Sequence, residues 1–364
     1  MKILHIAQRI QGGLASYLEE LLYYQEKSDL IENIIVSIPN TEKEYLTKNQ
    51  KTQYEYHNFI LRNIFTMFYF FVFCRKLIKK YNPDVIHLHS AFAGAIGRIA
   101  IITLPKNQSV TIYCAHGWSF DMPVSRIKKW LYIKTERILS IYTDVIINIS
   151  KHEYNRAATE GLPKSKLALI MNGTQDIQTE VQPLNFINQT EMNFVFIGRH
   201  DLQKGLDFLL NIFTNNNITA NLHILGEAVL NQNNQKSLKK QNIFFHGWQS
   251  RDKVDQFITS CDAVIMPSRW EGFGLVAIEA MKLSKPVIAN PVGALSEIIQ
   301  NKTNGYFIPF SETNKAAKMI NQMEKSDLAI LGRKARKTYL KSYQADRMAA
   351  EIQSCYIEAI RNTK

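Results

Sequence analysis

The chain has 364 residues, of which 46% are hydrophobic and 21% are charged, and its formal net charge is +12. This is the profile of an ordinary soluble globular protein, and a chain of this length can bury full cores without a disulfide or metal staple. Its four cysteines lie far apart and form no C-x-x-C pair. That spacing argues against a zinc site and a disulfide framework, and it favours reduced thiols in a cytoplasmic protein. The positive charge favours anionic partners such as nucleic acid, nucleotide phosphates or acidic lipids.

No membrane-spanning segment is expected from the sequence. Residues 1–13 contain one lysine and lack the long apolar region of a signal peptide. The most apolar run, residues 63–73, is about half as long as a helix that spans a bilayer.

Short apolar runs alternate with helical patterns in the first half of the chain. Residues 2–7 predict a buried strand, Gly12 and Gly13 predict a turn, and apolar residues at helical spacing within 14–22 predict a helix. Further strands are expected at residues 34–38, 84–88, 109–114 and 145–149.

The alternation of apolar runs and helical patterns begins again after a polar stretch, residues 174–191. Strands are expected at residues 194–197, 221–225, 243–245, 263–266 and 286–289, with a helical tail over residues 316–360. Strands alternating with helices predict an α/β protein with two Rossmann-like, doubly wound parallel sheets. We therefore expect a first domain at residues 1–178, a linker at 179–190 and a second domain at 191–345. The last helix, residues 346–364, is expected to pack back toward the first domain.

Two charged motifs follow predicted strands of the second half, at the sheet edge where ligands of such folds bind. Gly272 and Gly274 precede a helix that should begin near Leu275, and glycine amides at a helix N-terminus favour a negatively charged ligand. Glu271 lies in the loop and Glu279 in the first turns of the helix. One carboxylate can therefore meet a sugar while the other meets ribose hydroxyl groups.

The second motif is residues 198–205, GRHDLQKG, directly after the strand at 194–197. Its arginine, Arg199, can grip phosphate oxygens bidentately, and Lys204 adds a compact positive charge. Taken alone, this motif would also fit a basic loop that is merely exposed to solvent.

Together, EGFGLVAIEAM and GRHDLQKG resemble the E-x7-E and GR-x4-KG motifs of the retaining family-four glycosyltransferases of the GT-B fold. The resemblance covers nearly the whole chain, although its motifs are dense only in the second half. It implies two Rossmann-like domains facing a cleft, a nucleotide-sugar donor and retention of anomeric configuration. It also implies that Arg199 and Lys204 neutralise the departing diphosphate, that Glu271 orients the donor sugar and that Glu279 binds the ribose.

The same resemblance supplies the remaining expected contacts. His116 follows the strand at 109–114, where the resembling enzymes have a histidine that contacts the donor sugar. Ser150 matches a family position near the acceptor. No D-x-D metal motif occurs, so neither a metal nor another cofactor is expected. The donor-binding set is Gly12, Gly13, Gly198, Gly226, Gly272, Phe273, Gly274, Leu275, Val276 and Glu279.

Two segments of the first half combine aromatic and basic residues, namely residues 59–81 and 126–137. They could rest on an anionic membrane surface and admit a lipid-linked acceptor. A buried amphipathic helix with a solvated charged face would show the same pattern. The expected acceptor or membrane side comprises Ser150, Arg75, Lys76, Lys79, Lys80, Lys128, Lys129 and Trp130.

We therefore expect a hexosyltransferase that moves a sugar, from a UDP-sugar by family resemblance, to a glycan or polyprenyl-diphosphate-linked glycan of a bacterial surface polysaccharide. A sugar-nucleotide epimerase could share the double-Rossmann layout. A nucleic-acid-binding protein would also explain the charge, but the sequence has no recognisable nucleic-acid motif and both halves share the charge excess. The enzyme is expected in the cytoplasm, with peripheral attachment to the inner face of the plasma membrane as an open alternative.

Overall fold

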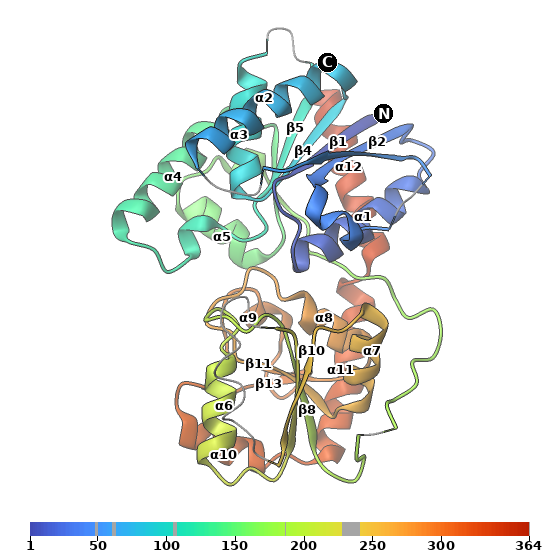
Figure 1. Ribbon diagram of the computed structural model, residues 1–364, viewed down its shortest axis with the longest axis vertical. Helices are drawn as coiled ribbons and strands as arrows, with labels where there is room; N and C mark the ends of the chain where they lie inside the picture. The colour runs from blue at the N-terminus through green and yellow to red at the C-terminus, as the bar shows by residue number, and fades with distance from the viewer. Residues whose placement is uncertain (48–49, 60–62, 105–107, 186, 228–240, 364) are drawn as a thin grey trace. The chain divides into compact units, whose positions relative to one another are not determined.

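A computed structural model describes residues 1–47, 50–59, 63–104, 108–185, 187–227 and 241–363. Its contacts divide the chain into two compact units (Figure 1). The first unit is Met1–Gln175 together with Ala345–Lys364, and the second unit is Asp176–Gln344. Among the described residues, no helix is long and apolar enough to cross a membrane.

The segment expected as a linker, 179–190, groups with the second unit rather than standing between the two. The backbone N–H of Leu184 donates to Ser260 Oγ at 2.7 Å. Leu184 and Ile187 are both buried. Apolar burial therefore fixes a stretch whose polar composition suggested a loose connection; residue 186 lies outside the described part of the chain.

The first unit is built on a seven-stranded parallel sheet of order β3-β2-β1-β4-β5-β6-β7. Five of its strands were predicted, but β3 and β7 were not. Its elements are β1 (Lys2–Ala7), α1 (Gly13–Glu26), β2 (Asn33–Pro39), η1 (Asn40–Tyr45), β3 (Thr52–His57), α2 (Ile64–Tyr81), β4 (Val85–His89), α3 (Ala91–Ile102), β5 (Val110–Cys114), η2 (Ser119–Asp121), α4 (Arg126–Ser140), β6 (Val145–Asn148), α5 (Lys151–Thr159), η3 (Lys164–Lys166), β7 (Leu167–Leu169) and the returning helix α12 (Ala345–Thr363).

Strand β4 shows how the two faces of this sheet differ. Successive residues of a strand point to opposite faces. Ile86 and Leu88 belong to an apolar cluster with Phe70 of α2. His87 points to the other face, where its Nδ1 lies 2.6 Å from the hydroxyl of Tyr356 on α12. Helices therefore cover both faces, and one face carries a polar layer beneath α1 and α12.

The second unit repeats the doubly wound plan with a six-stranded parallel sheet of order β10-β9-β8-β11-β12-β13. Helices α6 and α10 cover one face, where Phe194 and Phe196 of β8 are buried. Its elements are β8 (Asn193–Ile197), α6 (Leu206–Asn215), β9 (Asn221–Leu225), β10 (Ile243–Gly247), α7 (Arg251–Ser260), β11 (Ala263–Met266), α8 (Leu275–Lys282), β12 (Val287–Ala289), α9 (Leu295–Ile298), β13 (Gly305–Phe307), α10 (Thr313–Asn321) and α11 (Lys325–Ser342). The fold predicted from the alternating pattern is confirmed for both sheets.

A buried ion pair joins α3 to α4 in the first unit. Arg98 is 0% exposed, and its Nη2 lies 2.8 Å from Glu136 Oε2. Its Nε donates to the carbonyl of Gly94 at 2.8 Å, and its guanidinium carbon lies 3.9 Å from the ring centroid of Tyr113. The pair fixes the position of α4 at the surface of the unit.

We predict that Arg98→Met lowers the free energy of unfolding by about 3–5 kcal/mol, because the Glu136 carboxylate is left buried without its cation. Lys315→Met is the control, since Lys315 forms an exposed pair with Glu312 on a surface helix, and its change should stay within about 0.5 kcal/mol. Urea denaturation of both variants measures the difference. Equal small losses in the two would contradict a structural role for the buried pair.

Candidate active site

Two loops of the second unit meet where neighbouring strands end. Strands β8 and β11 are parallel neighbours, with Phe194 paired to Ala263, so their carboxyl ends lie at the same sheet edge. The loop after β8 carries Arg199 and Lys204, and the loop after β11 carries Glu271. Lys204 Nζ donates to Glu271 Oε2 at 2.6 Å and joins the loops by an ion pair. The structure thus brings together two residues predicted for the site that are 67 positions apart.

The Glu271 carboxylate is held rigidly. Its side chain is only 9% exposed, and the Ser268 hydroxyl donates to Oε2 at 3.3 Å. The Glu271 carbonyl accepts from the N–H of Ala294 at 3.4 Å. A Cβ added to Gly293 would lie 1.9 Å from that carbonyl oxygen, so only glycine permits this close approach.

Arg199 lies at the rim of the same site. Its side chain is 46% exposed, and its Nη2 lies 3.0 Å from Asp201 Oδ2 and 3.4 Å from Gln203 Oε1. Gln203 in turn donates to the carbonyl of Trp270 at 3.2 Å and ties the arginine loop to the second loop. A guanidinium group has five N–H donors. The geometry therefore orients a solvent-facing cation beside the Lys204–Glu271 pair.

Helix α8 begins at this edge, as predicted, at Leu275. Its N-cap is Gly274, with φ of +87°, and no side chain caps the first amides. Unpaired N–H groups at a helix N-terminus are suited to bind an anion. Glu279 lies one turn further on and is partly buried. Phe273, predicted among the donor contacts, is buried and packs edge-on against Tyr343, which assigns its ring to the core.

The predicted residues of the first unit also lie where strands of its sheet end. Gly12 and Gly13 are exposed in the turn between β1 and α1, and Gly12 is the N-cap of that helix. His116 follows β5 with a left-handed φ of +53° and packs edge-on against Tyr17, with ring centroids 4.5 Å apart. Burial lowers the pKa of His116 to about 3, so its imidazole is neutral at physiological pH.

Ser150 and the basic residues have different surroundings. Ser150 is buried as the N-cap of α5, where its hydroxyl accepts from the N–H of Glu153 at 3.1 Å. That bond gives Ser150 a structural role, and its placement near an acceptor stays a prediction. Arg75 donates to the Thr103 carbonyl at 2.8 Å, and Lys80 pairs with Glu55 at 2.6 Å. Lys76, Lys79, Lys128 and Trp130 are exposed on α2 and α4, and Lys129 is partly buried on α4.

Some residues of these sites were not anticipated from the sequence. Arg269 holds the Asp207 carboxylate bidentately at 2.7 and 2.6 Å and braces the second loop against α6. Gln25, on α1, contacts the polar layer of the first sheet through His5 Nε2, at 2.9 Å. Neither residue belongs to a recognisable motif, so the sequence offered no signal for them.

Two family models match the chain in sequence. One, described as Glycosyltransferase Family 4, matches residues 11–176, and the other, described as Glycosyl transferases group 1, matches residues 178–342. An uncharacterized 41.2 kDa protein in the cps region of Klebsiella pneumoniae is 33% identical over 330 residues, which are 88% of this chain and 89% of that protein. The UDP-Gal:alpha-D-GlcNAc-diphosphoundecaprenol alpha-1,3-galactosyltransferase of Escherichia coli is 23% identical over 79% of this chain and 78% of its own length.

The fold is also similar to that of solved structures. HepE of Anabaena, in a crystal structure with UDP and glucose, superimposes with a TM-score of 0.79 at 18% sequence identity, covering 98% of this chain and 100% of that one. At this identity the likeness establishes the GT-B fold.

The turn that carries Lys204 depends on Gly205. A Cβ added there would lie 2.2 Å from the carbonyl oxygen of Pro267, and φ is +70°. We predict that Gly205→Ala lowers the free energy of unfolding by at least ~2 kcal/mol, since the left-handed backbone alone costs ~1–2 kcal/mol and the clash adds to it.

Gly247→Ala is the control. Its φ is +68°, and an added Cβ would meet nothing closer than 3.8 Å. Chemical denaturation should show a clearly smaller loss there. Equal losses at the two positions would mean that the loops do not pack as closely as described.

Proposed function

The chain belongs to the glycosyltransferases of family 4 and group 1, and we propose that it transfers a hexose-type sugar from a UDP-sugar to a glycan or lipid-linked glycan with retention of configuration. The single observation that carries the donor half of this proposal is the junction of Arg199, Lys204 and Glu271 at one sheet edge. The UDP bound to HepE and the UDP-Gal in the name of the E. coli relative support uracil as the base of the donor. The cps region of the Klebsiella relative supports a role in surface polysaccharide assembly.

The charges at this edge suit the chemistry of glycosyl transfer. As the bond to the sugar breaks, negative charge develops on the nucleoside diphosphate, and preorganised donors stabilise it. Lys204 and Arg199 provide cations, and the uncapped amides at the start of α8 provide aligned dipoles. Gly12 and Gly13, predicted as donor contacts, present exposed backbone amides in the first unit. We propose that Lys204, Arg199 and the first amides of α8 replace a metal ion, so that transfer needs no added cofactor.

Glu271 then has an orienting role rather than that of a nucleophile. Its Oε2 already accepts hydrogen bonds from Lys204 and Ser268, at 2.6 and 3.3 Å. A carboxylate held in this way is poor at attacking a sugar carbon. This supports front-face transfer, with Glu271 orienting the donor sugar and Glu279 binding the ribose hydroxyl groups.

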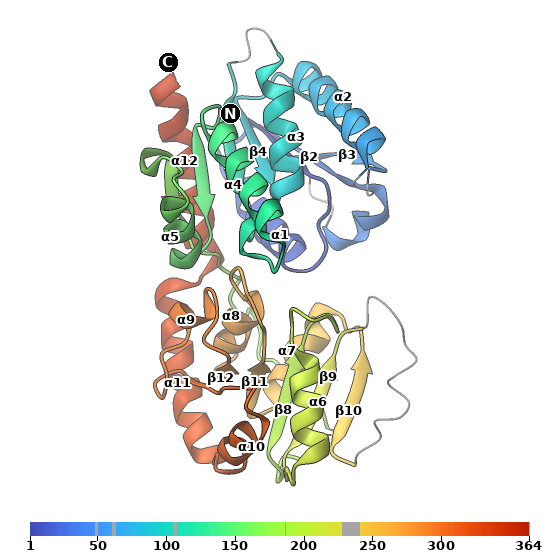
Figure 2. The same ribbon diagram turned by 90° about the vertical axis from the view of Figure 1, so that its left-hand side faces the viewer.

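A surface of the first unit suits an acceptor carried by a membrane. Helices α2, α3 and α4 pack side by side (Figure 2). Exposed apolar residues on them lie beside the lysines of α2 and α4, an arrangement that suits the interface of an anionic membrane. The exposed apolar side chains are Ile64, Phe65, Met67, Phe68, Tyr69 and Val72 on α2, Ile99 and Ile102 on α3, and Ile127, Trp130, Leu131, Tyr132 and Ile138 on α4. We propose that this surface, called here the α2–α4 face, binds the membrane that holds a polyprenyl-diphosphate-linked acceptor.

Lys204→Ala and Arg199→Ala should each lower kcat by about 100-fold to 1,000-fold, the cost of removing one donor that stabilises transition-state charge. Both variants should remain folded, because Arg199 is half exposed and Lys204, although its side chain is only 19% exposed, lies in a loop outside the apolar core of the unit. Release of UDP from radiolabelled UDP-sugars, with a membrane extract as the source of acceptor, measures the change. Turnover of the wild-type enzyme should persist in EDTA.

Lys315→Ala, which removes an exposed lysine of the same unit, serves as the control and should leave turnover unchanged. Near-normal turnover in both site variants would contradict the proposed donor site. Conversion of the donor into a sugar isomer without acceptor would instead identify an epimerase.

The double variants Lys76→Glu/Lys79→Glu and Lys128→Glu/Lys129→Glu should each weaken binding to vesicles of phosphatidylglycerol and phosphatidylcholine by at least about tenfold, since each basic residue near an anionic surface contributes about 1 kcal/mol. Vesicle sedimentation at low and high salt measures the binding. Lys334→Glu/Lys337→Glu, on exposed positions of α11, changes the charge equally and should have little effect. Equal losses in all three, or no binding at low salt, would remove the α2–α4 face as the docking surface.

A further inference from the structure

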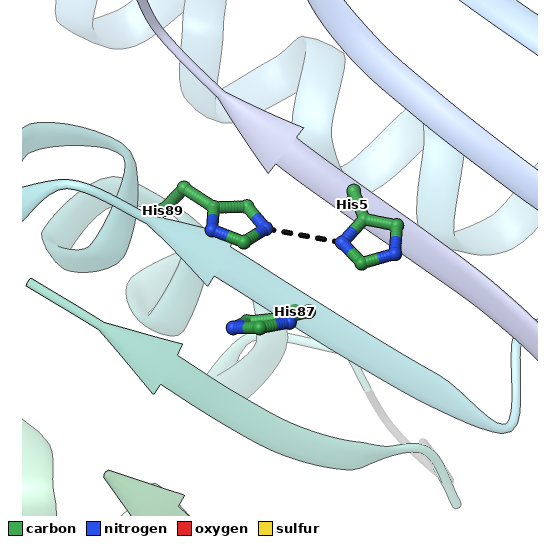
Figure 3. Close-up of side chains that lie close together, drawn as sticks. All are labelled: His5, His87 and His89. Atoms are coloured by element: carbon green, nitrogen blue, oxygen red, sulfur yellow. Dashed lines mark hydrogen bonds between the residues drawn. The ribbon is translucent and has the colours of Figure 1, made fainter. Parts of the chain in front are cut away.

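A continuous chain of hydrogen bonds crosses the polar layer of the first unit. His5 Nε2 bonds Gln25 Oε1 at 2.9 Å, and His5 Nδ1 bonds His89 Nε2 at 3.0 Å (Figure 3). His89 Nδ1 then bonds His116 Nε2 at 3.0 Å. The chain therefore runs from a helix side chain in the core to the histidine expected at the donor sugar.

The sheet itself brings these groups together. His5 on β1 is paired with His87 on the neighbouring strand β4, and His89 lies two residues further along the same face. All three histidines are buried, at 1% exposed or less. Gln25, at the end of α1, closes the inner end of the chain, and its Nε2 donates toward the Tyr356 hydroxyl at 3.4 Å.

The order of donors and acceptors follows from the amide. Burial lowers the pKa of His5 to about 4 and that of His89 well below its usual value, so each imidazole is neutral with one N–H. Because the amide oxygen of Gln25 can only accept, His5 carries its proton on Nε2 and presents a bare Nδ1. His89 must then donate from Nε2 and accept at Nδ1. The same step leaves His116 protonated on Nε2 with a lone pair on Nδ1.

The outer end of the chain is also fixed in orientation. The ring of His116 packs edge-on against Tyr17 at 4.5 Å, and no described residue forms a hydrogen bond to its Nδ1. A bare imidazole nitrogen accepts a hydrogen bond from a hydroxyl group. If Gln25 were reversed, every proton along the chain would change places, and Nδ1 would become a donor instead.

We propose that Gln25, His5 and His89 are positioning residues that hold His116 in the tautomer whose Nδ1 accepts a hydrogen bond from a hydroxyl group of the donor sugar. This inference rests on the proposed glycosyl transfer and deepens it. Gln25, deep in the fold, sets the proton position of a residue three hydrogen bonds away. The pairing favours sugars that present a hydroxyl group there over those that lack it.

A bound metal ion is the competing explanation of the cluster. His5, His87 and His89 each offer a ligand atom, and these atoms lie within 4.8 Å of one another. The rings of His87 and His89, however, lie with centroids 4.0 Å apart and planes only 36° apart. In-plane lone pairs of two such rings do not converge well on one ion. Because both ring nitrogens of His5 are hydrogen-bonded, to His89 and to Gln25, a metal bound by His5 would also require one of these two bonds to break.

The direct test is long-range 1H–15N NMR of the wild-type protein labelled at histidine. It should show Nε2 protonated and Nδ1 bare in His5, His89 and His116. Protonated Nδ1 in His116 would overturn the proposal, as would one equivalent of metal retained by the purified protein. The NMR measurement does not depend on enzymatic activity, so it tests the tautomers even if glycosyl transfer itself is not observed.

The kinetic test uses Gln25→Met, which removes the amide acceptor while keeping the side-chain length. It should lower kcat/KM for the UDP-sugar about tenfold, the value of one hydrogen bond, with UDP affinity unchanged. In a His116→Ala background, Gln25→Met should lower kcat/KM no further, because Gln25 acts only by positioning His116.

Gln25→Glu, which still accepts from His5, should retain the wild-type tautomers and most of the activity. Gln53→Met, which removes an exposed amide of β3 in the same unit, should leave both the histidine tautomers and kcat/KM unchanged. If the two losses of kcat/KM multiply in the Gln25→Met/His116→Ala double variant, Gln25 has only a structural role. That result would contradict the proposal that Gln25 acts through His116. If the wild-type enzyme transfers sugar and Gln25→Met has the same kcat/KM, the positioning role of Gln25 is contradicted, whereas the proposed function still stands.

Discussion

The ion pair between Lys204 and Glu271 links the parts of the second unit on which the proposed chemistry depends. It spans 2.6 Å between loops that leave neighbouring strands β8 and β11. With the side chains only 19% and 9% exposed, the pair is shielded from solvent and holds both loops in register. Glycines at the loop ends allow the backbones to approach, and Arg199 is left facing solvent beside them. A cationic edge with a rigid carboxylate beneath it is what a departing diphosphate and a sugar ring require.

In the first unit, the fold places a neutral polar group, the imidazole of His116, at the end of a strand of the parallel sheet. Desolvation keeps the buried histidines uncharged, and each must then find one donor and one acceptor. Their mutual hydrogen bonds meet that need for His5 and His89. The helix α12, which belongs to this unit although it ends the chain, covers the layer and supplies Tyr356. Core packing and site orientation are thereby coupled through the same side chains.

The sequence predicted most of this architecture, because buried parallel strands are continuous apolar runs between helical patterns. It missed β3, β7 and β13. The first, TQYEYH, lies at a sheet edge and is half polar, and the other two have only three residues each. The motif residues Arg199, Lys204 and Glu271 were predicted from their positions after strands and from the resemblance of their motifs to a family pattern, and their roles stay predictions. Their pairing was not predicted, since it depends on side-chain rotamers. Gln25 and Tyr356 were missed because 331 residues separate them and neither lies in a motif.

The claim on which the rest depends is that a nucleoside diphosphate binds at the carboxyl edge of β8 and β11. A crystal structure of the protein with UDP tests it most directly. The diphosphate oxygens should lie within hydrogen-bonding distance of Lys204 Nζ, the Arg199 guanidinium and the first amides of α8. UDP bound elsewhere, or at this edge without contacts to Arg199 and Lys204, would contradict the assignment.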